Sequence, residues 1–400
     1  MTRIAVVGGG PVGAAFAIAA SRALAGVEIV LIERNAPPAV AHEHGGESQP
    51  NFDHRVYALS PQSIALLADI DVWSRMATER LTPIDEMQVS SDAENVNDQL
   101  PLIHFSHGTP LAWMVEHRAL MIALYAALRE SNVIVRGGST VESMSLSGAK
   151  RTLAISGEDG DKVPLEVDLV VGADGRQSQV RELAGIDVVS KDYESVGIVA
   201  NFACEKPHGN VARQWFTQDG VLAYLPLPDG QISIVWSVKS AFAAILPAYA
   251  DPAFACAVAA AGHHNLGVLT PTSATDAIPL KRLTAGRWVE TGLALVGDAA
   301  HAIHPLAGQG VNLGFGDVRA LVALLGSRSV LTGIGDVAHL RRYARAQAEM
   351  TAAMGETTDC LHTLFLRNDI VSKWIRRSGF AWFDRANLVK RFATEYAVRR

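Results

Sequence analysis

The stretch that decides the fold is RIAVVGGGPVG, residues 3–13. Its first five residues form a β-branched run, which is typical of a strand buried on both faces of a parallel sheet. The next six satisfy the pattern G-x-G-x-x-G, with Pro11 and Val12 at variable positions. A helix of small residues is predicted over roughly Ala14–Ala25, and Val27–Ile32 is predicted to be a second strand. Together these residues predict a strand–turn–helix–strand unit.

Each part of this unit has a physical role in binding a dinucleotide. Gly8 makes the tight turn, Gly10 lets a pyrophosphate approach the backbone, and Gly13 allows close packing of helix against strand. Free N–H groups and the helix dipole then hold the phosphates. Glu33, twenty residues after Gly13 and followed by Arg34, is placed to accept hydrogen bonds from a ribose diol. The alternative is a glycine-rich turn with a purely structural role.

The same region has an unusually long run without charge. From Ile4 to Ser21 the chain has 18 residues with no charged side chain, which is close to the length of a membrane span. A signal peptide or a membrane anchor is therefore one interpretation. Four glycines and one proline interrupt the run, and the strand–turn–helix unit accounts for the same residues. We expect this segment to lie inside a sheet rather than to act as an anchor.

Composition and charge narrow the class of protein. The chain has 400 residues, with Lys+Arg 35 against Asp+Glu 41 and a net charge of −6. An acidic chain without clustered Lys and Arg is a poor nucleic-acid binder. Hydrophobic content of 49% predicts a large globular core divided into about two or three domains. No CxxC joins Cys204, Cys256 and Cys360, and no HExxH is present, so neither metal nor disulfides are expected and a cytoplasmic location is favoured.

Two further segments have the same strand-then-turn character. Residues 168–176 read DLVVGADGR, an apolar strand that ends in Asp174-Gly175. Residues 293–312 read LALVGDAAHAIHPLAGQGVN, another apolar strand followed by a glycine-containing loop. A helix is predicted after this loop, with Leu321 and Leu325 among its apolar residues.

The three segments together resemble the three fingerprints of class A FAD-dependent aromatic monooxygenases, which share the para-hydroxybenzoate hydroxylase fold. Residues 297–312 are similar to the narrower ubiquinone-biosynthesis hydroxylase family, as are Asp53-His54-Arg55 and Ala58-Leu59-Ser60. The resemblance covers most of residues 3–345, and the third fingerprint is its most specific part.

The resemblance implies FAD as the bound cofactor and NAD(P)H as co-substrate. It assigns the FAD pyrophosphate to the first fingerprint and the ribityl chain to Asp298. Asp174 and Gly175 are implied to lie near both FAD and the entering NAD(P)H, and the loop ending at Asn312 to line the isoalloxazine ring. The cofactor-binding residues predicted in this way are Gly8, Gly10, Pro11, Val12, Gly13, Glu33, Arg34, Arg55, Arg118, Asp174, Gly175, Gly297, Asp298, Pro305, Gly308, Gln309, Gly310, Val311 and Asn312.

The loop before the last predicted helix also has a physical argument. Gly308 and Gly310 permit backbone conformations that other residues avoid, so main-chain N–H groups can point inward. Together with the positive end of the helix, they would stabilise the negative N1–C2=O edge of reduced flavin. The alternative is a simple helix-entry loop. Only one G-x-G-x-x-G has a strand–helix frame, which favours transient docking of NAD(P)H over a second Rossmann domain.

The predicted fold class is α/β, with a discontinuous Rossmann-like FAD-binding domain, an inserted substrate domain and a C-terminal helical segment. Strand-like runs at residues 198–202, 211–216, 221–227 and 231–238 predict that the inserted domain is a mainly antiparallel β-sheet. Met87–Ser90 is a further possible strand. The predicted boundaries are 1–73, 113–187 and 281–336 for the FAD-binding domain, 74–112 and 188–280 for the substrate domain, and 337–400 for the helical region.

The substrate face is expected to be apolar, because ligand pockets are mostly lined by such residues. Trp215 stands where the family has Arg, and Val221 where it has Pro, so the usual substrate is less certain than the flavin. Filling of the core is the alternative role for each aromatic residue. The candidate substrate residues are Phe216, Leu225, Pro226 and Trp236.

The resemblance implies a hydroxylation in which the cofactor performs most of the chemistry. NAD(P)H reduces FAD, O₂ forms a flavin C4a-hydroperoxide, and one oxygen passes to an electron-rich ring, that of a polyprenylated ubiquinone precursor. No side-chain nucleophile is required, so no catalytic residue is assigned. His301 and His304 are acid–base candidates whose alternative role is to shape the loop. Other functions stay open: a flavin- or quinone-binding assembly subunit without turnover, or an isoprenoid epoxidase or reductase.

The C-terminal tail contains a possible membrane-binding element. Its aromatic residues are interspersed with basic ones, a pattern typical of an amphipathic helix at a membrane surface. Peripheral contact at the inner face of the membrane, or with a biosynthetic complex, is therefore one interpretation, and ordinary packing is the other. The residues concerned are Trp374, Phe380, Trp382 and Phe383 with Lys373, Arg376, Arg377 and Arg385.

Overall fold

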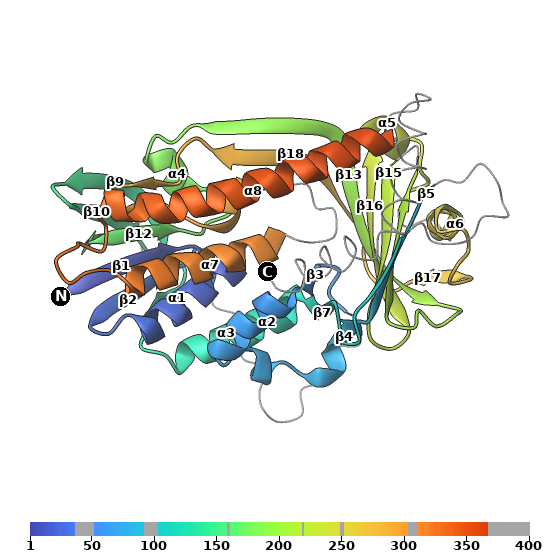
Figure 1. Ribbon diagram of the computed structural model, residues 1–400, viewed down its shortest axis with the longest axis horizontal. Coiled ribbons are helices and arrows are strands. Elements are labelled where there is room, and N and C mark those ends of the chain that lie inside the picture. Colours follow the sequence, from blue (N-terminus) through green and yellow to red (C-terminus); the bar gives the residue numbers. More distant parts are fainter. Residues whose placement is uncertain are drawn as a thin grey trace.

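The structure is a computed structural model, and it describes residues 1–36, 52–91, 103–157, 161–217, 220–248, 252–302 and 310–366. A parallel sheet with its helices lies at one end of the molecule and a large, mostly antiparallel sheet at the other (Figure 1). The long helix α8 (Val337–Leu366) runs from the first end to the second.

Six strands form the parallel sheet: β1 (Thr2–Val7), β2 (Val27–Ile32), β8 (Ile134–Arg136), β12 (Leu169–Gly172), β19 (Val289–Glu290) and β20 (Leu293–Leu295). Their order is β19-β20-β12-β1-β2-β8, with only the edge strand β19 antiparallel to its neighbour. The last four residues of β1 and of β2 are buried, as expected for a sheet covered on both faces. The three predicted fingerprint strands β1, β12 and β20 are therefore adjacent.

Helix α1 (Pro11–Ala23) packs on β1 and β2. The other helices of this part of the molecule are α2 (Pro61–Asp69), α3 (His117–Arg129), α4 (Gln179–Leu183) and α7 (Gly310–Gly326). The buried face of α1 is rich in alanine, and these small side chains let α1 contact both α3 and α7 closely. Three 3₁₀ turns complete the helical part, η1 (Trp73–Arg75), η2 (Thr78–Arg80) and η3 (Gly297–Ala299). The N-terminal uncharged run is thus β1, a turn and α1, as predicted.

Two small antiparallel sheets flank the parallel sheet. One has the order β11-β10-β9, and the other, which faces the large sheet, has the order β3-β7-β4. Their strands are β3 (Val56–Leu59), β4 (Thr82–Ile84), β7 (Ala112–Glu116), β9 (Thr140–Ser147), β10 (Lys150–Ser156) and β11 (Lys162–Val167).

The large sheet has the order β21-β18-β13-β16-β15-β14-β5-β6, with β17 paired to β13. Its neighbouring strands are antiparallel except for β14 and β5, which are parallel. Its strands are β5 (Glu86–Ser91), β6 (Ile103–Ser106), β13 (Val188–Cys204), β14 (Val211–Phe216), β15 (Gly220–Pro226), β16 (Gln231–Lys239), β17 (Leu269–Pro271), β18 (Asp276–Ala285) and β21 (His301–Ala302).

The large sheet has two chemically different faces. The outer face packs under α5 (Ser240–Ala243) and α6 (Pro252–Ala261), where Trp215 and Tyr224 join Phe254 in one apolar cluster. The inner face turns toward the small sheet β3-β7-β4, where Leu225 of β15 packs with Met114 of β7. A strand alternates its side chains between faces, so each residue of β14, β15 and β16 belongs to one environment only.

The α/β fold class and the antiparallel sheet predicted from the sequence are confirmed. Residues 211–216 form β14 as expected, and the possible strand at residues 87–90 lies inside β5. The exact domain boundaries stay a prediction, and β18 continues across the boundary drawn between residues 280 and 281. Within the described part of the chain, no helix combines the length and apolar character that a membrane span requires.

Candidate functional site

The loops after β1, β12 and β20 meet at the carboxyl ends of the strands of the parallel sheet. Gly8 donates its N–H to the carbonyl of Ile32 at 2.8 Å, and Ala173 donates to Val7 at 2.8 Å. Val296 donates to the carbonyl of Gly172 at 2.9 Å. These bonds place the first residue of each loop beside the neighbouring strand, at the carboxyl ends where open α/β sheets bind their ligands.

The glycines of the first loop serve different purposes. Gly8 has a φ of 102°, and a Cβ there would lie 2.5 Å from the carbonyl oxygen of Ala173. A Cβ on Gly13 would lie 1.9 Å from the carbonyl oxygen of Gly8. A Cβ on Gly10 would have no atom within 4 Å. Gly8 and Gly13 are therefore required by packing, whereas Gly10 borders space that a pyrophosphate can occupy.

The N-terminus of α1 is available to an anion. Gly10 is its N-cap residue, no side chain caps it, and its first turn contains no acidic residue. Pro11 is at the start of the helix, where its missing N–H costs nothing. The side chain of Val12 faces the third loop, since a Cβ on Gly297 would lie 3.3 Å from it. The helix dipole thus points its positive end at the gap beside Gly10.

Glu33 lies where β2 ends, beside the first loop. Its carboxylate accepts the N–H of Gly9 at 2.5 Å and the N–H of Asn35 at 2.9 Å. The hydroxyl of Tyr125 donates to the carbonyl of Gly9 at 3.2 Å, and burial together with the Glu33 charge raises the pKa of Tyr125 to about 12. Arg34 is exposed next to it. Tyr125 comes from α3, and nothing in the sequence pattern connects it to this loop.

In the second loop, Asp174 holds the following helix. Its two carboxylate oxygens accept the hydroxyl of Ser178 at 2.5 Å and the N–H of Val180 at 3.0 Å. Gly175 has a φ of 80° and a Cβ there would meet no atom within 4 Å. The Asp-Gly pair therefore ends β12, begins α4 and leaves open space at Gly175.

Arg181 of α4 connects the second and third loops. Its buried guanidinium donates to the carbonyl of Ala299 at 2.9 Å and to that of Arg176 at 2.7 Å. Burial lowers the pKa of Arg181, and the nearby charge of Asp174 opposes this. Arg176 in turn pairs its Nε with Asp298 at 3.2 Å. This connection was not predicted, because the sequence gives no sign that two segments over 100 residues apart share a guanidinium.

Asp298 lies between the loop and the last helix of the site. It belongs to η3 and is half-exposed, and a Cβ on Gly310, the first residue of α7, would lie 3.9 Å from its Oδ1. Gly310 was predicted to lie in the loop before the helix, but it is the first residue of α7, and Val311 is buried in the core behind it. The predicted residues Pro305, Gly308 and Gln309, and with them His304, lie outside the described residues.

Asn312 attaches α7 to the segment between β3 and α2. Its Oδ1 accepts the N–H of Ser60 at 3.0 Å and the hydroxyl of Ser63 at 2.7 Å, while its Nδ2 donates to the carbonyl of Ala58 at 2.8 Å. Two sequence motifs that point to one family are therefore in direct contact, although 252 residues separate Ser60 from Asn312.

A second polar group surrounds Arg55 and Arg118. The hydroxyl of Tyr57 lies 2.8 Å from Nδ1 of His117, and the N–H of His117 donates to the carbonyl of Arg55 at 2.9 Å. Burial and then the Arg55 charge lower the pKa of His117, and burial raises that of Tyr57, where the Asp298 charge also acts. The N–H of Arg118 donates to Asp53 at 3.2 Å. Tyr57 and His117 were not among the predicted residues.

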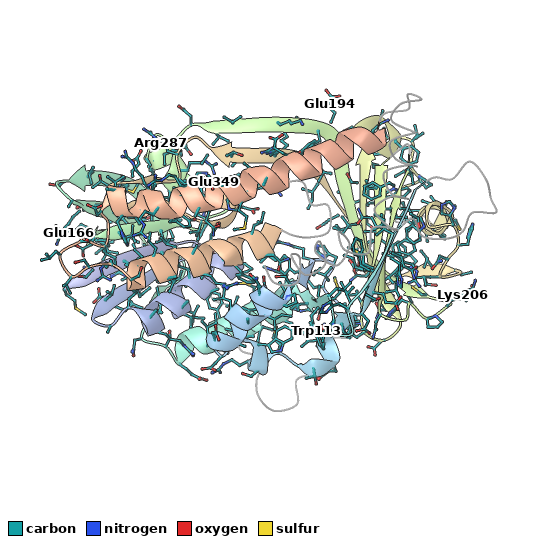
Figure 2. All side chains as sticks on the ribbon, viewed as in Figure 1. Trp113, Glu166, Glu194, Lys206, Arg287 and Glu349 are labelled. Atoms are coloured by element: carbon teal, nitrogen blue, oxygen red, sulfur yellow. The ribbon has the colours of Figure 1, made fainter. Side chains whose placement is uncertain are left out.

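The structure separates the four candidate substrate residues. Phe216 and Leu225 lie on the inner face of the large sheet, in two apolar clusters. Trp236 lies on the outer face, with its ring 6.0 Å from that of Phe242. Pro226 follows Leu225 on β15, so it faces the opposite way. Exposed charged residues such as Glu166, Lys206 and Arg287 point away from the molecule (Figure 2).

The chain matches known flavoproteins over most of its length. Residues 1–358 match the family described as FAD binding domain. The Escherichia coli protein 3-demethoxyubiquinol 3-hydroxylase is 35% identical over 99% of this chain and 98% of its own. Ubiquinone hydroxylase UbiL of Rhodospirillum rubrum is 32% identical over 99% of this chain and 89% of its own.

Among solved structures, p-nitrophenol 4-monooxygenase PnpA from Pseudomonas putida superimposes with a TM-score of 0.74, at 18% identity and with 100% of both chains covered. This likeness shows a shared fold. The family match implies bound FAD. The site fits this cofactor, because the three loops meet at the carboxyl ends of the strands, Gly10 borders open space and no side chain caps the N-terminus of α1. The chain therefore belongs to the FAD-dependent monooxygenases, within the ubiquinone-biosynthesis hydroxylase family.

Proposed function

We propose that this protein hydroxylates the aromatic ring of a polyprenylated ubiquinone precursor, with FAD as cofactor and NAD(P)H and O₂ as co-substrates. The observation that carries this proposal is the full-length similarity to 3-demethoxyubiquinol 3-hydroxylase. The fold supports it, because the loops that resemble the family fingerprints meet at one edge of the sheet.

Bound FAD, once reduced by NAD(P)H, supplies the activated oxygen that enters the ring. The residues of this chain bind and orient the reactants. The N–H groups at the start of α1, beside Gly10, hold the pyrophosphate, and Glu33 holds the adenosine ribose. Asp298 binds the ribityl chain, and the positive end of α7 favours negative charge on the flavin ring.

The inner face of the large sheet is where we place the substrate ring. Val199 and Val235 are directly opposite each other in the middle of this sheet, yet both are partly exposed. Ile198 and Trp236, their chain neighbours on the outer face, are buried. The inner face thus leaves apolar side chains partly exposed, and a water-poor surface there would protect the activated oxygen.

Gln214 is one of the polar residues on this face. It lies between Val89 and Ala223 on neighbouring strands and is 7% exposed. Its amide makes no hydrogen bond to any residue that the structure describes. Ligand pockets combine apolar walls with a few polar groups, and we propose that this amide donates a hydrogen bond to an oxygen substituent of the substrate ring.

A stopped-flow experiment tests the proposed activity. Full-length protein with FAD is mixed with NADH or NADPH without oxygen, and flavin absorbance is followed. The expected result is bleaching of the flavin, and oxidation of NAD(P)H in air that accelerates when a short-chain prenylated phenol is added. Flavin that binds but is never reduced would contradict the proposal and favour an assembly subunit without turnover.

We also propose that the protein contacts the membrane peripherally. A long prenyl chain places the substrate in a bilayer, and the aromatic and basic residues of the tail, at 373–385, suit a membrane surface. These tail residues lie outside the described part of the structure, so the support comes from the sequence alone.

A further inference from the structure

A buried charge pair lies directly behind the third loop. His301 and Asp317 are each 2% exposed, and Nε2 of His301 lies 2.7 Å from Oδ2 of Asp317. The same carboxylate oxygen accepts the N–H of Gly297 at 2.8 Å. Oδ2 of Asp317, on α7, thus contacts both Gly297, which precedes Asp298, and His301, which lies three positions after it.

The backbone around Asp298 is held from three elements. Asp317 of α7 holds Gly297, Arg181 of α4 holds the carbonyl of Ala299, and Tyr343 of α8 donates to the carbonyl of Leu295 at 2.9 Å. Gly297 has a φ of 57°, a conformation that other residues rarely adopt. The turn that presents Asp298 therefore depends on long-range contacts.

The surroundings of His301 favour its charged form. Its ring stacks on Trp288 with 4.8 Å between ring centroids. Burial lowers the pKa of His301, but Asp317, with a smaller contribution from Asp298, raises it above the ordinary value. The other titratable group of this cluster is Tyr343, whose pKa burial and Asp317 raise. His301 and Asp317 thus form a salt bridge, and Asp317 also accepts the N–H of Gly297.

Such a pair has little value for stability alone. Replacing a buried ion pair with apolar residues is often neutral or stabilising, because desolvation offsets the attraction. Its documented use is to select one arrangement over others. Here the arrangement selected is that of the loop containing Asp298, where the FAD is bound.

We propose that Asp317 and His301 are positioning residues for FAD, which lock the Gly297 turn so that Asp298 faces the cofactor. Neither side chain needs to touch the reacting atoms. The proposal concerns affinity for FAD, so it stands or fails independently of which ring is hydroxylated.

Two variants test the pair against a matched control. Asp317→Asn keeps the shape of the side chain and removes the charge, and His301→Gln removes the other partner. The control is Glu290→Gln, because Glu290 pairs with buried Arg151 at 2.9 Å on the edge strand β19 of the same sheet. FAD release from full-length holoprotein is measured by flavin fluorescence, and unfolding by urea.

Both pair variants should weaken FAD binding by roughly tenfold or more, the scale of a hydrogen bond to a charged group. The control should lose stability but keep its FAD affinity within about twofold. Equal losses of stability in all three variants, with unchanged FAD affinity, would show a purely structural role and overturn the proposal.

The pH dependence of the unmodified protein gives a second test that requires no variant. A histidine whose folded pKa is raised stabilises below its unfolded value of 6.5 and loses that contribution as pH rises through the folded pKa. FAD affinity should therefore fall with rising pH in the wild type and change less in Asp317→Asn. If the FAD affinity of the wild type does not change as the pH rises above 6.5, the proposal is also overturned.

Discussion

At the scale of single residues, the first loop shows how one motif combines packing and binding. Gly8 and Gly13 have no room for a side chain, because backbone atoms of Ala173 and Gly8 lie where a Cβ would be. Gly10 has that room, so packing does not require a glycine there. The sequence pattern cannot separate these two reasons, since all three positions are glycine.

Two alanine substitutions distinguish a glycine required by packing from a glycine required by ligand binding. Gly13→Ala should destabilise the protein by more than about 3 kcal/mol or prevent folding, because its Cβ would overlap a buried carbonyl. Gly10→Ala should change the free energy of unfolding by less than about 1 kcal/mol, while weakening FAD binding by at least about tenfold. Urea unfolding and flavin titration measure the two effects. A Gly10→Ala protein that binds FAD normally would show that the pyrophosphate lies elsewhere.

At the scale of elements, strand alternation assigns each side chain of the large sheet to a face. Gln214 follows Arg213 and precedes Trp215 on β14, and Trp215 packs on the outer face at 4.7 Å from the ring of Tyr224. Gln214 is therefore on the inner face. Trp215, which departs from the family pattern, lies away from this face.

Substitutions on the two faces should have opposite effects. Gln214→Leu should change the free energy of unfolding by less than about 1 kcal/mol, since the amide makes no hydrogen bond to the described residues, and should lower kcat/KM by roughly tenfold. Tyr224→Phe, on the outer face, removes a hydrogen bond to the carbonyl of Val258 at 2.7 Å. It should cost about 1 kcal/mol of stability and leave kcat/KM unchanged. If Tyr224→Phe lowers kcat/KM and Gln214→Leu does not, the substrate is on the other face.

The strands, turns and helix starts could be predicted from the sequence, because they depend on neighbouring residues in the chain. The run before Gly8, the glycine spacing and Pro11 at a helix start each predict their own structure. The contacts between distant segments could not be predicted from the sequence. Arg181 holding Ala299, and Asn312 holding Ser60, join residues over 100 positions apart with no pattern in the chain that marks them. The resemblance supplied the roles of Arg55 and Asp298, and their geometry had to come from the structure.

At the scale of the whole molecule, the flavin site and the substrate sheet are parts of one framework. The long strand β13 pairs with β18, and β18 pairs with β21, which contains His301. Asn201 of β13 donates to the carbonyl of Asp53 at 3.1 Å, just before Arg55. The helix α8 runs from the parallel sheet to the large sheet (Figure 1). Strand pairing and this hydrogen bond therefore join the large sheet directly to the residues around Asp298 and Arg55.

The proposed membrane contact can be tested on the whole chain. Full-length protein and a chain ending at Asn368 are mixed with anionic liposomes and centrifuged through a density gradient. The full-length protein should float and the shortened one should stay in the dense fraction, because the aromatic and basic residues of the tail are missing. Equal flotation of the two would reject the tail as the membrane contact.

As a whole, the molecule is proposed to transfer an oxygen atom from O₂ to an aromatic ring by means of FAD and NAD(P)H. The most direct measurement is mass spectrometry of the product after turnover in ¹⁸O₂ with a short-chain prenylated phenol. We expect one ¹⁸O atom in the ring product for each NAD(P)H coupled to product formation. A product without ¹⁸O, or NAD(P)H oxidation that yields only hydrogen peroxide with every prenylated phenol, would contradict it.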